Sequence, residues 1–167
     1  MNKTIIIILF VVIGAVGLMW WGKSIQTSGI YATKLGNSNN SSLTASEKLY
    51  DFGKISMKNG DVTKEFVITN PTDKDIFIPS LTTSCMCTKA FIVRSDGIIK
   101  GPFGMLGMGY VPPANETIKA GESRIIRVVY DPKAHGPAGV GRIDRFVTLS
   151  DETGRQLQLE IKALVTP

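Results

Sequence analysis

The residues with the clearest chemical potential are two cysteines in the stretch TTSCMCTKAF, residues 82–91. Cys85 and Cys87 are separated by Met86, and the 167-residue chain has no other cysteine. Two thiols this close could bind a soft metal ion, act as a redox pair, form a tight disulfide or fill a buried core. The rest of the chain has to favour one of these four interpretations.

Soft-metal binding gains support from residues of the same chemical type elsewhere in the chain. Two methionines lie in the glycine-rich stretch 100–113, and a loop rich in glycine and proline carries the only histidine. Thiolates, thioethers and imidazole together form the donor set that selects Cu(I). The candidate metal ligands are therefore Cys85, Cys87, Met105, Met108 and His135.

The other interpretations of the cysteines rest on more general arguments. A disulfide between Cys85 and Cys87 would close so short a loop that it would add little stability, and its ring would be strained. A redox pair usually lies beside a cation or a helix N-terminus, whereas the sequence places only Lys89 near the pair. Burial in a core needs no ligand, because cysteine is among the most often buried residue types. Burial and a soft-metal site are therefore the two competing interpretations.

Short strands separated by turn residues must position these side chains. The clearest strand covers 155–165, where apolar and polar residues alternate. Pro79 interrupts the strand predicted at 75–81 and indicates a sheet edge or a bulge. The other predicted strands cover 49–55, 63–69, 89–93, 123–130 and 142–149. About seven strands of this kind predict an all-β fold, an immunoglobulin-like antiparallel β-sandwich, over residues 47–167.

The N-terminus has a different composition. From Ile5 to Trp21 no residue carries a charge or a strongly polar side chain, a length near the minimum for a bilayer-spanning helix. A cleavable signal peptide is the alternative, but Trp20 and Trp21 occupy the positions where small residues would form the cleavage site. We therefore expect a signal anchor with a single transmembrane helix at 1–22 and a flexible linker rich in Ser, Asn and Gly at 23–46.

The anchor and the charge pattern limit the compartment and the partners. A single short N-terminal anchor usually exports the domain that follows, so we expect residues 47–167 on the periplasmic or cell-surface side of the membrane, where disulfides can form. The net charge of +5 arises from 19 lysines and arginines that never stand next to one another, so we expect no nucleic-acid partner. With one histidine and no nucleophile-elbow motif, we also expect no enzymatic activity.

Four motifs resemble a known bacterial family, the domain of unknown function 1573. They are YDFGKI at 50–55, KEFVITNPTDKDIFI at 64–78, TSCMCT at 83–88 and AGESRIIRVVYDP at 120–132. The resemblance spans residues 48–165, with an insertion between Cys87 and Ala120. It implies an exported, often membrane-anchored or lipidated protein whose sandwich is similar to ciliary and major-sperm-protein modules. The family has no settled biochemical function, so the resemblance implies no activity.

A binding or scaffolding role is the leading hypothesis for the function. The stretch GPFGMLGMGYV at 101–111 is apolar yet rich in glycine, which predicts an exposed loop that contacts a protein partner or a membrane. The membrane itself is expected to be reached through the N-terminal helix. The alternative function is Cu(I) binding through the Cys-Met-Cys element, the methionine-bearing loop and the histidine.

Overall fold

The computed structural model describes residues 41–167, which form an all-β domain. The predicted signal anchor at 1–22 and most of the predicted linker at 23–46 lie outside these residues. Within residues 41–167, no helix combines the length and the apolar character that crossing a membrane requires.

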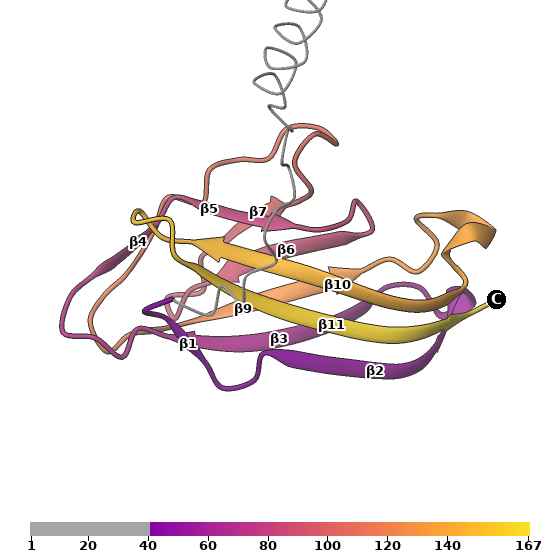
Figure 1. Ribbon diagram of the computed structural model, residues 1–167, viewed down its shortest axis with the longest axis horizontal. Coiled ribbons are helices and arrows are strands. Elements are labelled where there is room, and N and C mark those ends of the chain that lie inside the picture. Colours follow the sequence, from indigo (N-terminus) through magenta and orange to yellow (C-terminus); the bar gives the residue numbers. More distant parts are fainter. Residues whose placement is uncertain (1–40) are drawn as a thin grey trace, which may run out of the picture. The chain divides into compact units, whose positions relative to one another are not determined.

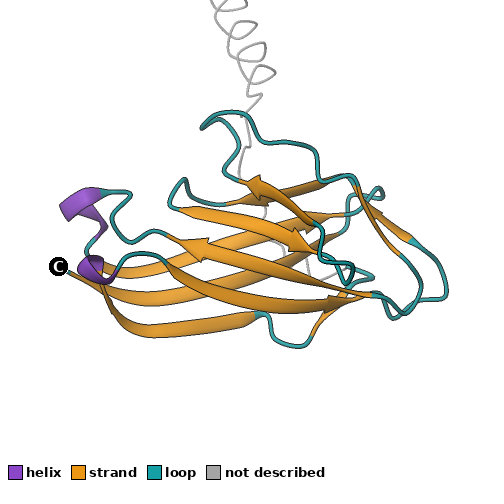
Figure 2. Cartoon of the chain, turned by 180° about the vertical axis from the view of Figure 1, so that it is seen from behind, coloured by secondary structure: helices purple, strands orange, loops and turns teal. Residues whose placement is uncertain are grey.

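Two main sheets and one small sheet build the domain (Figure 1). The first sheet has the order β1-β3-β9-β6-β7, with the respective bounds Thr44–Ala45, Val62–Thr69, Ser123–Tyr130, Thr88–Val93 and Ile99–Phe103. The second sheet has the order β2-β11-β10-β5, with the respective bounds Leu49–Ser56, Gln156–Thr166, Gly141–Ser150 and Ser80–Thr83. The small sheet pairs β4, Ile76–Ile78, with β8, Glu116–Ile118. Two 3-10 helices are also present, η1 at Met57–Asn59 and η2 at Gly136–Gly139 (Figure 2).

The predicted β-sandwich is confirmed, because buried side chains from both main sheets form one core cluster. Strands β9 and β11 show the regular alternation of buried and less buried residues that a sheet with one inner face produces. In β11, Leu157, Leu159 and Ile161 are almost completely buried, as the sequence pattern predicted. Burying each of these side chains contributes about 1.5–3 kcal/mol relative to exposure. Strands β9 and β11 therefore each supply a row of side chains to the core between the two main sheets.

Two details of the strand pairing differ from the prediction. Strands β2 and β11 run parallel, whereas the other paired strands are antiparallel. A parallel pair needs a long connection, and the chain between the first long strand and the last supplies one. In addition, β1 falls within the predicted linker, where it pairs with β3 and follows the buried Leu43. The folded region therefore begins a few residues before the boundary predicted at Glu47.

The single strand predicted at 75–81 is two strands in different sheets. Pro79 separates β4, which pairs with β8, from β5, which pairs with β10. Proline has no N–H to donate to a strand ladder, so a change of sheet at this position forfeits no hydrogen bond. The carbonyl of Pro79 accepts a hydrogen bond from the N–H of Ala114 at 2.9 Å, which ties the switch to the segment before β8.

The insertion between Cys87 and Ala120 contains β7 and β8, which the sequence pattern did not predict. Strand β7 forms the edge of the first sheet next to β6. Gly101 of β7 lies so close to β6 that a Cβ there would be 2.9 Å from the carbonyl oxygen of Ala90. Between β7 and β8 the chain forms the long loop at the top of Figure 2. The insertion therefore extends the first sheet and adds a large loop beside it.

Candidate functional site

The two cysteines lie in the turn between β5 and β6, which carries the chain from the second sheet to the first (Figure 1). The N–H of Thr88 donates to the carbonyl of Cys85 at 3.1 Å. The hydroxyl of Thr83 lies 3.1 Å from the carbonyl oxygens of both Cys85 and Thr88 and donates to them. Ser84 and Phe146 of β10 exchange two hydrogen bonds of 2.9 Å. These contacts fix the turn, and with it the place of the sulfurs.

A disulfide joins Cys85 and Cys87, and a different polar group approaches each sulfur. Nε2 of His135 lies 3.1 Å from Sγ of Cys85. Nε of Arg145 donates to Sγ of Cys87 at 3.2 Å. The two cysteines are largely buried, with exposed fractions of 8% and 2%, whereas His135 is exposed. An imidazole therefore stands beside one sulfur and a guanidinium beside the other.

His135 reaches the disulfide from the loop between β9 and β10, which lies at the same end of the domain as the cysteine turn (Figures 1 and 2). Asp131 starts this loop: its carboxylate accepts from the N–H of Lys133 at 2.7 Å, and its own N–H donates to the carbonyl of Cys87 at 2.9 Å. Gly139 packs closely against His135, because a Cβ there would lie 3.3 Å from the His135 Cβ. The conformation of the loop thus places the imidazole beside the turn.

Three of the five candidate metal ligands come together. The ligand atoms of the two cysteines and of His135 all lie within 4.8 Å of one another. Met105 and Met108 line a shallow surface pocket together with Met86, and neither cysteine lines this pocket. A Cu(I) site at the cysteines stays a prediction, because thiolate ligands would first require reduction of the disulfide.

The sequence argument against a redox role of the cysteines has a wrong premise. The sequence places only Lys89 near the pair, whereas the structure also places Arg145 and His135 in contact with the sulfurs. These two residues are separated from their cysteines by 58 and 50 positions. Pairing of β10 with β5 brings Arg145 to the turn. Only this long-range pairing could have revealed the cation, since no local motif contains it.

The loop between β7 and β8 exposes a cluster of apolar side chains, as predicted for this stretch. Leu106, Met108 and Tyr110 have exposed fractions of 67%, 57% and 86%. Met86 and Met105 are exposed as well, and with Met108 and Tyr110 they line the shallow pocket. Single exposed apolar residues are ordinary on protein surfaces, but a cluster of them is typical of a contact site.

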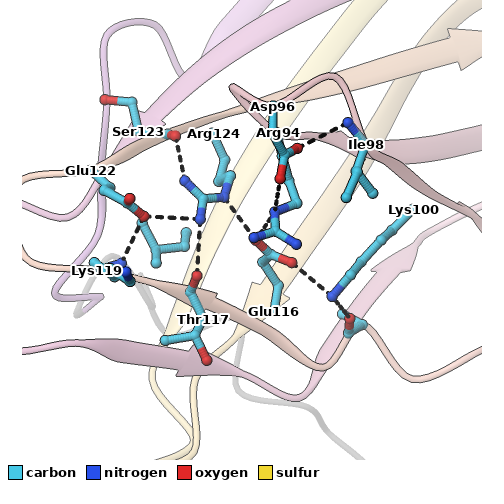
Figure 3. Close-up of polar contacts among 12 residues, drawn as sticks. Arg94, Asp96, Ile98, Lys100, Glu116, Thr117, Lys119, Glu122, Ser123 and Arg124 are labelled. Atoms are coloured by element: carbon cyan, nitrogen blue, oxygen red, sulfur yellow. Dashed lines mark hydrogen bonds and ion pairs between the residues drawn. The ribbon is translucent and has the colours of Figure 1, made fainter.

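A second polar cluster surrounds the buried carboxylate of Glu116 (Figure 3). Nε of Arg124 and Nζ of Lys100 each lie 2.7 Å from its oxygens, and Nε of Arg94 lies 3.5 Å away. Arg124 also contacts Glu122 at 3.0 Å. Burial alone would raise the pKa of Glu116, but hydrogen bonds from Lys100 and Arg124 outweigh it and hold the pKa below its ordinary value. Glu116 on β8 therefore links the small sheet to β7 and β9 of the first sheet.

The fold and the cysteine turn define a β-sandwich domain with a cation-flanked cysteine pair between its sheets. The family described as protein of unknown function (DUF1573) matches residues 43–108. The resemblance predicted from the motifs is therefore confirmed over these residues. The motif at 120–132 lies beyond the matched part. A search of curated proteins found no match.

Solved structures show the same fold at low sequence identity. A protein of unknown function from Porphyromonas gingivalis W83 is 16% identical with a TM-score of 0.53, over 73% of this chain and 46% of that one. A family 123 glycoside hydrolase from Clostridium perfringens is 6% identical with a TM-score of 0.50, over 71% of this chain and 22% of that one. This chain thus spans less than half the length of either protein, and the likeness concerns the fold alone.

Proposed function

We propose that this chain is a membrane-anchored binding module with an immunoglobulin-like sandwich, exposed on the extracytoplasmic side and bound to a protein partner. The exposed apolar cluster in the β7–β8 loop is the observation that carries the proposal. Tyrosine and methionine are enriched at protein interfaces, and both are exposed in this loop. The uncharged stretch from Ile5 to Trp21 supports the membrane anchor.

The partner contact is best made by side chains of the loop rather than by a partner strand added to the sheet. Strand β7 is the free edge next to the loop, and partner strands commonly pair with such edges. However, Pro102 in β7 has no N–H to donate, and proline on an edge strand blocks regular pairing. Leu106 and Tyr110 are therefore the expected centre of the interface.

Photo-crosslinking in intact cells tests this proposal. A photoreactive amino acid in place of Leu106 should give discrete cross-linked products, whereas the same residue in place of Leu164, an exposed leucine of β11, should give none. The products should disappear when Met108→Ser and Tyr110→Ser are added, because these changes remove the apolar contact. Equal cross-linking at the two leucines would contradict the proposed surface. Protection of the domain from protease added outside the cytoplasmic membrane would contradict its proposed location.

Soft-metal binding is a second candidate function, favoured by the convergence of two cysteine sulfurs and the His135 imidazole. In the reduced chain these groups would offer two thiolates and one nitrogen, a donor set that suits Cu(I). Met105 and Met108 would then be auxiliary ligands, reached only if the loop that carries them approaches the turn. Cu(I) titration of the reduced chain, beside a Cys85→Ser/Cys87→Ser variant, tests this function. Equal retention of Cu(I) by both proteins would exclude it.

A further inference from the structure

We propose that the Cys85–Cys87 pair is a thiol–disulfide exchange site, in which Arg145 stabilises the leaving sulfur and His135 carries a proton at the other. The partner would be a dithiol on a protein in the same compartment. This activity goes beyond the proposed binding function and does not depend on the apolar loop, since its geometry lies entirely in the turn and in the segments packed on it.

The position of Arg145 is the first argument for this activity. A disulfide sulfur is neutral and a weak acceptor, whereas a thiolate gains a charge-assisted hydrogen bond from a guanidinium. Among the ion pairs of residues 41–167, none includes Arg145, and its other hydrogen bond goes to the carbonyl of Asp144 at 2.9 Å. The charge of Arg145 is therefore available to Cys87. Its hydrogen bond to Sγ becomes strong when the disulfide opens and Cys87 becomes a thiolate.

The unequal surroundings of the two cysteines set the direction of attack. Cys85 retains an exposed fraction of 8% and lies beside the exposed His135. Cys87 is exposed by only 2% and is held by Arg145. An incoming thiolate therefore reaches Sγ of Cys85, and Cys87 leaves. This assignment places the more accessible sulfur on the outside and the cation beside the sulfur that acquires negative charge.

The turn keeps its anchors when the bond between the sulfurs opens. The N–H of Ser84 donates to the carbonyl of Phe146, and the N–H of Phe146 donates to the hydroxyl of Ser84. The N–H of Asp131 donates to the carbonyl of Cys87. None of these contacts uses a sulfur atom. A disulfide across so short a loop also restricts the unfolded chain very little. The bond can therefore open and close while the two sheets stay packed.

Exchange with a partner dithiol transfers two electrons. The first partner thiolate attacks Sγ of Cys85 and forms a mixed disulfide, and the electron pair of the broken bond leaves on Cys87. The second thiolate of the partner then attacks the partner's first sulfur, which is bound to Cys85 in the mixed disulfide. The partner's two sulfurs become joined, and Cys85 is released. The partner dithiol becomes a disulfide, and the cysteine pair becomes two thiols. The two protons lost by the partner reach the two cysteine sulfurs, one of them by way of His135.

Reduction of the oxidised full chain by dithiothreitol in mild detergent tests the role of Arg145, with maleimide labelling of the freed thiols read by mass spectrometry. The wild type should be reduced without a change in its far-UV circular dichroism. Arg145→Gln should be reduced about three- to tenfold more slowly, because loss of the cation raises the basicity of the leaving thiol at a Brønsted slope of ~0.5. Arg145→Lys should recover part of the rate. Arg142→Gln, an exposed arginine of the same strand, is the matched control.

Single-cysteine variants test the direction of attack and the class of partner. Cys87→Ser leaves the accessible Cys85, which should form mixed disulfides at least about tenfold faster than the buried Cys87 of a Cys85→Ser variant. Each variant is treated in parallel with oxidised glutathione and with a peptide that contains a disulfide. Faster reaction with the peptide supports a protein partner, and faster reaction with glutathione overturns it.

Two results would overturn the exchange site itself. One is a disulfide that resists dithiothreitol until urea unfolds the domain. The other is an equal rate of reduction for the wild type, Arg145→Gln and Arg142→Gln. Neither result depends on cross-linking at Leu106, so failure of the exchange site and failure of the proposed binding surface can be told apart.

Discussion

Replacing the buried Glu116 by glutamine should strongly destabilise the domain. Glu116→Gln keeps the shape of the side chain but removes the charge that compensates Arg124 and Lys100. The side chains of Glu116 and Arg124 are only 3% and 4% exposed, so water compensates little of the charge that Arg124 would leave unpaired. Removing one partner of such a buried pair costs about 3–5 kcal/mol. Arg124 keeps Glu122 at 3.0 Å, so we expect a loss of about 3 kcal/mol, at the lower end of this range.

The same carboxylate should make stability depend on pH. The pKa of Glu116 is lowered in the folded domain. Its contribution to the free energy of unfolding is therefore complete above the ordinary pKa of 4.5 and is lost as the pH falls through the lowered folded pKa. The wild type should therefore lose stability below about pH 4.5, where the unfolded chain binds the proton more readily. Glu116→Gln lacks this group and should lose less stability over the same interval. The free energies of unfolding of the two proteins should converge in acid.

Urea unfolding of the full chain in mild detergent measures both effects. Far-UV circular dichroism is the suitable signal, because both tryptophans, Trp20 and Trp21, lie outside the described domain. Glu65→Gln is the matched control, since Glu65 pairs with Arg127 on the surface with side-chain exposures of 46% and 36%. Such an exposed pair is worth about 0–1 kcal/mol. Equal losses for the two variants at pH 7, or an unchanged gap between wild type and Glu116→Gln at pH 3, would refute the reasoning.

Two further substitutions test the backbone of the fold by the same urea assay. Gly101→Ala should cost about 1–3 kcal/mol, because its Cβ would meet the carbonyl oxygen of Ala90 at 2.9 Å, whereas Gly104→Ala, with open space around it, should cost less than half of that. A smaller loss for Gly101→Ala than for Gly104→Ala would show that β7 can move away from β6. Asn70→Ala should cost about 1–3 kcal/mol, because the fully buried Asn70 donates to the carbonyl of Ile118 at 2.9 Å and alanine would remove this buried hydrogen bond. A loss below about 0.5 kcal/mol would mean that water reaches this carbonyl.

The sequence predicted those parts of the fold that local alternation encodes. Strands β9 and β11 were predicted within a residue of their ends, because each presents apolar side chains to the core at every second position. Strands β7 and β8 were missed, because Gly101 and Pro102 interrupt β7 and β8 has only three residues. The change of sheet at Pro79 was also missed, since a proline indicates an interruption but not where the chain goes next.

The candidate site was predicted in its cysteines and its histidine but not in its cation. His135 stands out because it is the only histidine, whereas Arg145 is one of many basic residues and becomes notable only through the register of β10. Met105 and Met108 were predicted as ligands from their chemical type. In the structure they line a pocket together with Met86, and neither cysteine lines that pocket. Residue type alone cannot distinguish these two arrangements.

The path of the chain through β4, β5 and β6 has a consequence for how the domain unfolds. Within this short segment the chain visits all three sheets, with Pro79 at one crossing and the cysteine turn at the other. Strand β5 is joined to β4 of the small sheet at one end and to β6 of the first sheet at the other. Separation of β5 from β10 therefore also disturbs these two sheets. We therefore expect neither main sheet to detach as a separate cooperative unit. We expect the slowest-exchanging amide hydrogens of β10 and of β9 to share one free energy of opening, equal to that of global unfolding.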